Sequence, residues 1–288
     1  MTDLINNVVI TGAGSGLGRA FALQFAHMGY DICLSDINEE GLQQTLTLIT
    51  EAGAQQGLKI DIWTFNLDVR NPSQWQDLLA AVVARWGCVG TVINNAGVAH
   101  ADRMGDGQWQ DWQWVLDINL KGVMLGCHTF TPLMKQQGHG RLLNIASLAG
   151  IMNPPTMSAY NVSKAGVIAL SDTLHFELKP YGIDVTVLCP NFFKTNLNDS
   201  MRSSDANLKK SSKRLIEDKP SMSVDDIAAT AIKALFQGKR LCVPDTMGRF
   251  AAFAKTYLPF IVRRKIRVIS QGMRQRELKQ KQLAQSDQ

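Results

Sequence analysis

The sequence has little that suits a secreted, disulfide-bonded or metal-binding protein. It has five cysteines in 288 residues, an odd number, and no Cys-x-x-Cys pair. They are Cys33, Cys88, Cys127, Cys189 and Cys242. Four lie in apolar runs, so we expect buried free thiols in a reducing compartment. Cysteine and histidine are too scattered for a zinc site, and we expect no metal.

Long apolar stretches are also missing. No segment is long and apolar enough to span a bilayer. The first seven residues carry neither a basic region nor a long apolar run, so we expect no secretory signal and a cytoplasmic location. No linker or internal repeat divides the chain. Its length suits one large α/β domain with a substantial core.

Positive charge is concentrated in the tail. Residues 239–288 hold 12 Lys/Arg and 3 Asp/Glu, a balance of +9. The net charge of the chain is +5, so the other 238 residues carry −4. The tail has no nucleic-acid-binding motif, and we expect no nucleic-acid partner.

Six short runs are apolar nearly throughout, as parallel strands covered on both faces are. They are residues 8–10, 32–34, 92–93, 142–145, 185–188 and 241–243. Amphipathic helical patterns lie between them, for example at 75–86. This alternation predicts a doubly wound sheet with helices on both faces. Ligands bind such sheets at the carboxyl ends of the strands.

A glycine-rich turn follows the first apolar run, at Thr11–Gly18. Glycines keep such a turn tight and let backbone N–H groups approach a pyrophosphate, and the next helix adds its positive N-terminus. Asp36 ends the second run, where a carboxylate can bind ribose hydroxyls. A glycine turn without a ligand, and an Asp that only caps a turn, are the plainer interpretations.

Three further motifs follow later runs. Asn94–Gly97 would let the chain pass close to a cofactor, although such sequences are usually only turns. Tyr160 and Lys164 share one helical face, and a nearby ammonium lowers the pKa of a phenol from about 10. On spacing alone the pair could equally lie on a solvated helix. Ser147 could donate to a carbonyl oxygen. Asn119 is polar in an otherwise apolar helix, where it is unfavourable unless needed.

In this order the motifs strongly resemble the short-chain dehydrogenase/reductase family, in its short, single-domain branch. The resemblance covers about residues 7–243. It implies a Rossmann fold with seven strands in the order 3-2-1-4-5-6-7. The family usually has Gly after the proline at 190, and this chain has Asn191, which tolerates left-handed backbone better than most residues.

The resemblance also implies a catalytic tetrad. Tyr160 would be the acid/base, and Lys164 would lower its pKa and bind the nicotinamide ribose. Ser147 would polarise the substrate oxygen, and Asn119 would hold a water in a proton relay. Ser147 and Tyr160 would contact the substrate. The implied cofactor contacts are Gly12, Ser15, Gly16, Leu17, Gly18, Asp36, Asp68, Val69, Asn95, Gly97, Tyr160, Lys164, Pro190, Phe193 and Thr195.

Two classes of function remain. The first is an oxidoreductase that moves a hydride between a nicotinamide dinucleotide and an alcohol/carbonyl pair. The second is a non-catalytic dinucleotide-binding sensor or regulator on the same fold, which would not need Ser147, Tyr160 and Lys164 together. An epimerase of the extended branch is a weaker alternative, because the chain seems short for its added substrate domain.

The cofactor is expected to be NAD rather than NADP. Asp36 would repel a 2′-phosphate, and Ile37 and Ser15 stand where NADP-preferring relatives usually place a basic residue. Arg19 is a counter-signal that also fits ordinary helix capping of the binding loop. We expect a small apolar alcohol or ketone as substrate, and a homodimer or homotetramer. The expected pocket residues are Leu148, Ile151, Met152, Pro154, Pro155, Met157, Phe192 and Phe193, with residues 197–223 as a mobile lid.

We expect a catalytic domain at residues 1–245 and a basic amphipathic tail at 246–288. Two short helices are predicted, one with Met247, Phe250, Phe253 and Tyr257 on one face. The second begins near Pro259 and aligns Val262, Ile266, Ile269 and Met273 opposite several arginines. Such a tail could dock on its own domain or a neighbouring subunit, or lie on an anionic membrane surface.

Overall fold

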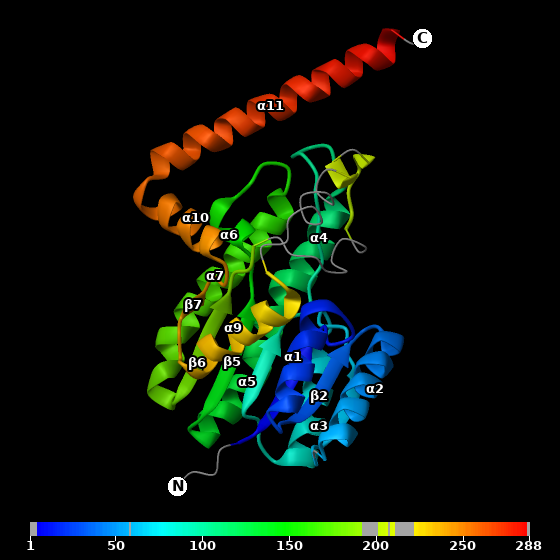
Figure 1. The fold of residues 1–288 in the computed structure, drawn as a ribbon, viewed down its shortest axis with the longest axis vertical. Coiled ribbons are helices and arrows are strands. Elements are labelled where there is room, and N and C mark those ends of the chain that lie inside the picture. The colour runs from blue at the N-terminus through cyan, green and yellow to red at the C-terminus, as the bar shows by residue number, and fades with distance from the viewer. Residues whose placement is uncertain (1–4, 58, 192–200, 207, 211–221, 287–288) are drawn as a thin grey trace.

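The computed structural model describes residues 5–57, 59–191, 201–206, 208–210 and 222–286. Seven parallel strands form one sheet in the order β3-β2-β1-β4-β5-β6-β7, which confirms the expected topology (Figure 1). The strands are β1 Asn7–Thr11, β2 Asp31–Asp36, β3 Ile62–Asn66, β4 Thr91–Asn94, β5 Gly140–Ile145, β6 Ile183–Leu188 and β7 Leu241–Cys242. All run in the same direction, so their carboxyl ends meet at one edge.

One strand, β3, is not among the six apolar runs. It is an edge strand, and its positions are half-buried or exposed rather than buried. Thr64 and Asn66 interrupt its apolar residues, so a search for continuous apolar runs passes over it.

Helices cover both faces of the sheet (Figure 1). They are α1 Gly16–His27, α2 Glu39–Gln56, α3 Pro72–Trp86, α4 Trp109–Leu116, α5 Gly122–Gln137, α6 Leu148–Met152, α7 Ser158–Leu178, α9 Val224–Phe236, α10 Thr246–Tyr257 and α11 Pro259–Ser286. A π-helical turn, Asp117–Lys121, joins α4 to α5, and a 3₁₀ turn, Lys179–Tyr181, follows α7. The helices α1, α2 and α9 pack on one face of the sheet, and α3, α5 and α7 pack on the other.

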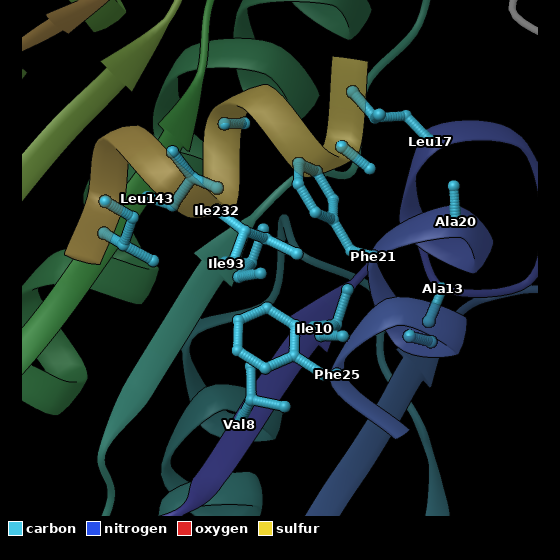
Figure 2. Packing of buried hydrophobic residues seen from close by; sticks show 14 of the residues in the cluster. Val8, Ile10, Ala13, Leu17, Ala20, Phe21, Phe25, Ile93, Leu143 and Ile232 are labelled. Atoms are coloured by element: carbon cyan, nitrogen blue, oxygen red, sulfur yellow. The ribbon is translucent and has the colours of Figure 1, made fainter. Parts of the chain in front are cut away.

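The core on the first face forms between α1, α9 and the central strands. Figure 2 shows Phe21 and Phe25 of α1 near Ile10, Ile93 and Ile232, and all five side chains are buried. Burial of each such side chain contributes about 1.5–3 kcal/mol, so this layer fixes α1 firmly against β1. The glycine turn between those two elements is held in place as a result.

The cysteines agree with the expectation of free thiols. All five are unpaired, and all but Cys88 are buried. Burial raises the pKa of Cys33, Cys127 and Cys189 to about 12. These thiols therefore stay protonated at neutral pH and behave as small apolar side chains.

The tail corrects one expectation. α10 has the predicted position, but the second helix, α11, runs for 28 residues and is not short. Beyond Met273 the sequence consists mainly of strong helix formers with no Gly or Pro to stop the helix. α10 begins at the cap Asp245, whose carboxylate accepts from the Gly248 N–H at 2.6 Å. Within the described part of the chain, no helix combines the length and apolarity needed to cross a bilayer.

Trp75 is the largest fully buried side chain on the second face. Its Nε1 donates to the Val69 carbonyl at 2.9 Å, and its ring meets that of Phe130 edge to face. Because α3 and α5 both pack around it, truncation would leave a large cavity and an unpaired carbonyl.

Replacement of Trp75 by alanine should lower the free energy of unfolding by about 3–5 kcal/mol. Urea titration followed by circular dichroism measures this loss. Trp109→Ala is the matched control, because Trp109 is exposed and its removal should cost little. Equal loss in both variants would contradict the assignment of Trp75 to the core.

Candidate functional site

The glycine turn after β1 approaches its neighbours too closely for side chains. Gly12 and Gly16 have positive φ, at 67° and 50°. A Cβ on Gly18 would collide with the Gly12 carbonyl, so α1 can pack against the turn only with glycine at 18. Ser15 caps α1 in extended conformation, and the first N–H groups of that helix, around Leu17, have no partner within the helix. The turn therefore fits a phosphate group.

The turn after β4 braces the glycine turn. Asn95 Nδ2 donates to the carbonyls of Thr11 and Gly12, at 2.9 and 3.1 Å. The Thr11 hydroxyl accepts from the N–H groups of Asn95 and Ala96. Asn95 thus braces the glycine turn and fixes the ends of β1 and β4 together.

Asp36 stands at the end of β2, as expected, and one carboxylate oxygen accepts from the Gly14 N–H at 2.9 Å. Its other oxygen accepts from the Asn38 N–H at 3.0 Å. Arg19 does not pair with it in these contacts. The Arg19 guanidinium instead donates to Thr45 and to the Gly14 carbonyl, which makes it a brace of the turn.

Asp68 and Val69 follow β3 near the same edge. The Asp68 carboxylate forms a bidentate pair with Arg70, with contacts of 2.6 to 3.1 Å, and this pair lowers the pKa of Asp68. Val69 is buried against Gly122, and its carbonyl accepts from Trp75. Asp68 is thus held in its ionised form, with its geometry set by Arg70.

Tyr160 and Lys164 lie on α7 and are both buried, 6% and 4% exposed. They are not on a solvated helix, so the plainer interpretation of the pair is wrong. Lys164 Nζ donates to the Ile145 carbonyl at 2.8 Å and lies 5.9 Å from the centre of the Tyr160 ring. Gly97 lies beside them, since a Cβ there would be 3.5 Å from Lys164 Nζ. Two elements, the β4 turn and α7, therefore meet at this point.

Burial governs the protonation of this pair. It lowers the pKa of Lys164 to about 8. It also raises the pKa of Tyr160, while a hydrogen bond with Ser147 acts in the opposite direction. The net shift of Tyr160 is upward, opposite to the lowering expected from a neighbouring ammonium, because loss of solvation outweighs the favourable contacts.

Ser147 follows β5 and caps α6. Its hydroxyl accepts from the Ala149 N–H at 3.1 Å and also lies within hydrogen-bonding reach of Tyr160. The Pro190 carbonyl, after β6, accepts from the Leu148 N–H at 2.9 Å. Pro190 therefore flanks the same site. Phe193 and Thr195, the other expected contacts of this segment, lie outside the described residues, as does Phe192.

Asn119 is fully buried in the π-helical turn. Its Oδ1 accepts from the Val98 N–H at 2.8 Å, and its Nδ2 donates to the Val98 carbonyl at 2.9 Å and to Ser163 Oγ at 3.2 Å. Short π-helical turns of this kind are frequently found at functional sites. Asn119 therefore joins the β4 turn to α7. Its contact on α7 is Ser163, which lies three residues after Tyr160.

The residues expected to line the substrate pocket lie in different surroundings. Met157 and Ala149 are buried in one small cluster with Tyr160. Ile151 instead packs against the core beneath α7. Thr156 has φ of 69°, an outlier for a β-branched residue, and such strain is often found beside functional sites. Residues 197–200 and 211–221 of the expected lid lie outside the described residues.

The structure contains two groups of buried polar residues that the sequence does not indicate. Asn94 Nδ2 donates to Asn144 Oδ1 at 2.8 Å, and Asn144 Nδ2 donates to Ser171 Oγ at 3.0 Å, which ties β4 and β5 to α7. His100 and Asp102, both buried, approach to 3.1 Å in the loop after β4. No spacing in the sequence indicates either group, because the partners are distant or stand in a loop.

The Asp102 carboxylate also joins that loop to the segment after residue 200. It accepts from the N–H and hydroxyl of Ser204, at 2.9 and 2.7 Å. Backbone bonds link Ala99 and Ala101 with Arg202, and Asp102 forms a bridge with Met157. The loop that contains Ala99, Ala101 and Asp102 therefore contacts both the segment at residues 202–204 and Met157. The described residues contain no cluster of His, Cys, Asp and Glu that could hold a metal ion.

Known proteins resemble this chain in sequence. Residues 6–206 match the short chain dehydrogenase family. The probable oxidoreductase EphD of Mycobacterium tuberculosis is 36% identical over 191 residues, which cover 66% of this chain but only 31% of EphD. The 3-oxoacyl-[acyl-carrier-protein] reductase FabG of Thermotoga maritima is 33% identical over 193 residues, 67% of this chain and 76% of FabG.

Solved structures resemble it in fold. A short-chain dehydrogenase/reductase from Burkholderia phymatum in complex with NAD superposes with a TM-score of 0.81 at 28% identity, covering 89% of this chain and 95% of the other. Levodione reductase superposes with a TM-score of 0.75 at 29% identity, covering 86% and 98%. With the family match over most of the chain and the Rossmann sheet just described, this protein is a member of the short-chain dehydrogenase/reductase family.

Proposed function

We propose that the chain transfers a hydride between NAD(H) and an alcohol/carbonyl pair, with Asn119, Ser147, Tyr160 and Lys164 as its catalytic residues. The observation that carries this proposal is the meeting of three of these side chains in one buried site. Ser147 lies close enough to Tyr160 to act against the rise in the pKa of its hydroxyl, and the Lys164 ammonium lies 5.9 Å from the centre of the Tyr160 ring.

A nicotinamide dinucleotide fits the residues around this site. The glycine turn and the start of α1 would bind its pyrophosphate, Asp36 its adenosine ribose, and Asp68 and Val69 would lie near its adenine. Asn95 and Gly97 would line its path toward Tyr160. When bound, the nicotinamide supplies or accepts the hydride.

The protein's own part of the reaction is movement of a proton. During reduction, the Tyr160 hydroxyl gives its proton to the substrate oxygen, while Ser147 donates a hydrogen bond that stabilises the growing negative charge. The Lys164 ammonium stabilises the phenolate that Tyr160 leaves behind. Oxidation reverses these steps. Asn119 also fixes Val98 and Ser163 near the site through its side-chain amide.

The non-catalytic sensor is less well supported. Binding of a dinucleotide requires the glycine turn and Asp36, but not a buried Tyr160 with Ser147 and Lys164. A lysine that is 4% exposed and has a lowered pKa is costly to the fold, so its presence favours a chemical role.

The preference for NAD rests on the end of β2. A carboxylate at the end of β2, where Asp36 stands, would repel the 2′-phosphate of NADP. Arg19, the cation nearby in sequence, is engaged with the glycine turn and Thr45. The Burkholderia relative was solved with NAD. These observations support NAD as the cofactor.

An apolar substrate is favoured by the side chains around Tyr160. Ala149 and Met157 are buried in one cluster with Tyr160. Ala99, Ala101 and Met201 form a second buried apolar cluster, whose loop is joined to Met157 through the bridge at Asp102. Apolar surroundings of this kind suit an aliphatic or aromatic alcohol or ketone better than a charged acid. A homo-oligomer and a cytoplasmic location remain part of the proposal.

Replacement of Tyr160 by phenylalanine should lower kcat by about a thousandfold or more, because the hydroxyl that carries the proton is lost. NADH binding, measured by fluorescence titration, should change little. Tyr181→Phe is the matched control, since Tyr181 is half exposed and distant in the 3₁₀ turn. An active phenylalanine variant at position 160 would refute the proton-transfer role.

The Asp36→Asn variant separates charge from hydrogen bonding at the end of β2. An amide oxygen can still accept from the Gly14 N–H, but the repulsion of a 2′-phosphate is removed. The ratio of KM for NADPH to KM for NADH should exceed one in the native protein and fall by about tenfold in the variant. A native preference for NADPH would overturn the NAD proposal.

The substrate class is tested by a panel of alcohols and ketones graded by chain length, with NADH absorbance as the readout. Values of kcat/KM should rise with apolar size, by up to about tenfold for each well-buried methylene. Small charged hydroxy acids serve as the comparison. A clear preference for those acids would contradict the apolar assignment without affecting the prediction for Tyr160.

A further inference from the structure

The tail carries an exposed aromatic face. It consists of Met247, Phe250, Phe253 and Tyr257 on α10 and Phe260 at the start of α11. These side chains are between 54% and 72% exposed, and the rings of Phe253 and Tyr257 lie 4.7 Å apart. Large apolar side chains gathered on one surface usually mark a binding site.

The protein's own domain does not cover this face. α10 packs against α6, and the residues of α10 that are buried are Gly248 and Ala254. In α11, Val262 is buried, while Ile269 is 56% exposed and Val268 is 62% exposed. Figure 1 shows α11 as a long helix that leaves the body of the protein. Docking on its own domain, one of the roles considered for the tail, therefore leaves the aromatic face open.

The same stretch of the tail is rich in cations. Residues 246–273 contain six Lys/Arg and no Asp/Glu. Arg263, Arg264, Lys265 and Arg267 are exposed, and the salt bridges found among the described residues do not include them. The apolar positions of α11 end near Met273, after which its residues are polar. The apolar and cationic groups thus share the same stretch of the tail.

This combination favours an anionic surface over a second copy of the chain. A two-fold contact between two tails would bring like charges together, because each copy presents the same six cations. An anionic bilayer satisfies both features, since aromatic rings settle among the headgroups and Lys/Arg attract their phosphates. The absence of a spanning helix among the described residues is consistent with a helix that lies on the bilayer.

We propose that α10 and the first half of α11 bind the surface of an anionic lipid bilayer through the aromatic face and its flanking cations. α10 packs against α6, which begins directly after Ser147. Binding would therefore place the Ser147 side of the protein near the lipid. The proposal concerns attachment and does not depend on catalysis.

The test is sedimentation of the full chain with vesicles. Phosphatidylcholine vesicles containing phosphatidylglycerol should pellet the protein at low salt, and pure phosphatidylcholine vesicles should not. Added salt should release it. Arg264→Glu/Arg267→Glu should weaken binding by at least about tenfold, since each cation near such a surface contributes roughly 1 kcal/mol. Phe250→Ser/Phe253→Ser should weaken it as well.

Matched controls exclude general effects of charge or polarity. Lys233→Glu/Lys239→Glu makes the same charge change on exposed lysines at and after α9, and Phe176→Ser removes an equally exposed phenylalanine on α7. Both should bind vesicles like the native protein, and circular dichroism checks that every variant folds. Failure of the native chain to bind anionic vesicles overturns the proposal. So does unchanged binding by the arginine variant, or loss of an oligomer instead of vesicle binding in the Phe250/Phe253 variant.

Discussion

The contact between the ends of β1 and β4 fixes the edge of the sheet on which the rest of the site depends. The Thr11 hydroxyl and the Asn95 amide hold these two strand ends together through five hydrogen bonds. Because the strands are parallel, this edge also receives the ends of β2, β5 and β6. The glycine turn, Asp36, Ser147 and Pro190 all depend on that shared edge for their proximity. Helix α7 then adds Tyr160 and Lys164, held over β5 by the bond to the Ile145 carbonyl.

Electrostatics at this edge depends on exclusion of water. Lys164 loses most of its solvent and retains one backbone carbonyl, so its pKa falls to about 8. Tyr160 loses solvent too, and its pKa rises. The protonation states of Tyr160 and Lys164 therefore depend on any charged or polar group that enters the site, as well as on the pH of the solution. A site of this kind responds strongly to a charged or polar neighbour.

Much of the fold could be predicted from the sequence because its core strands are nearly uniform. Six of the seven strands are continuous apolar runs, and the glycine turn and Asp36 follow two of them directly. β3 could not be predicted from an apolar run, because it is an edge strand and its residues are only partly buried. The length of α11 could not be predicted, because the second half of the helix has no apolar periodicity that would show where it ends. The network of Asn94, Asn144 and Ser171 could not be predicted, since its members are linked by sheet register rather than by spacing.

Asp102 contributes to the structure by joining loops to one another, and in this it differs from the proposed catalytic residues. The proposed catalytic residues lie directly after β5, in the π-helical turn and on α7, whereas Asp102 joins the loop after β4 to Ser204 and, through a backbone bridge, to Met157. The segments near Tyr160 are thus linked in part by contacts between loops. Changes in these loops can alter the size and polarity of the substrate region while the proton-carrying groups keep their positions. The architecture lets substrate range evolve independently of the reaction.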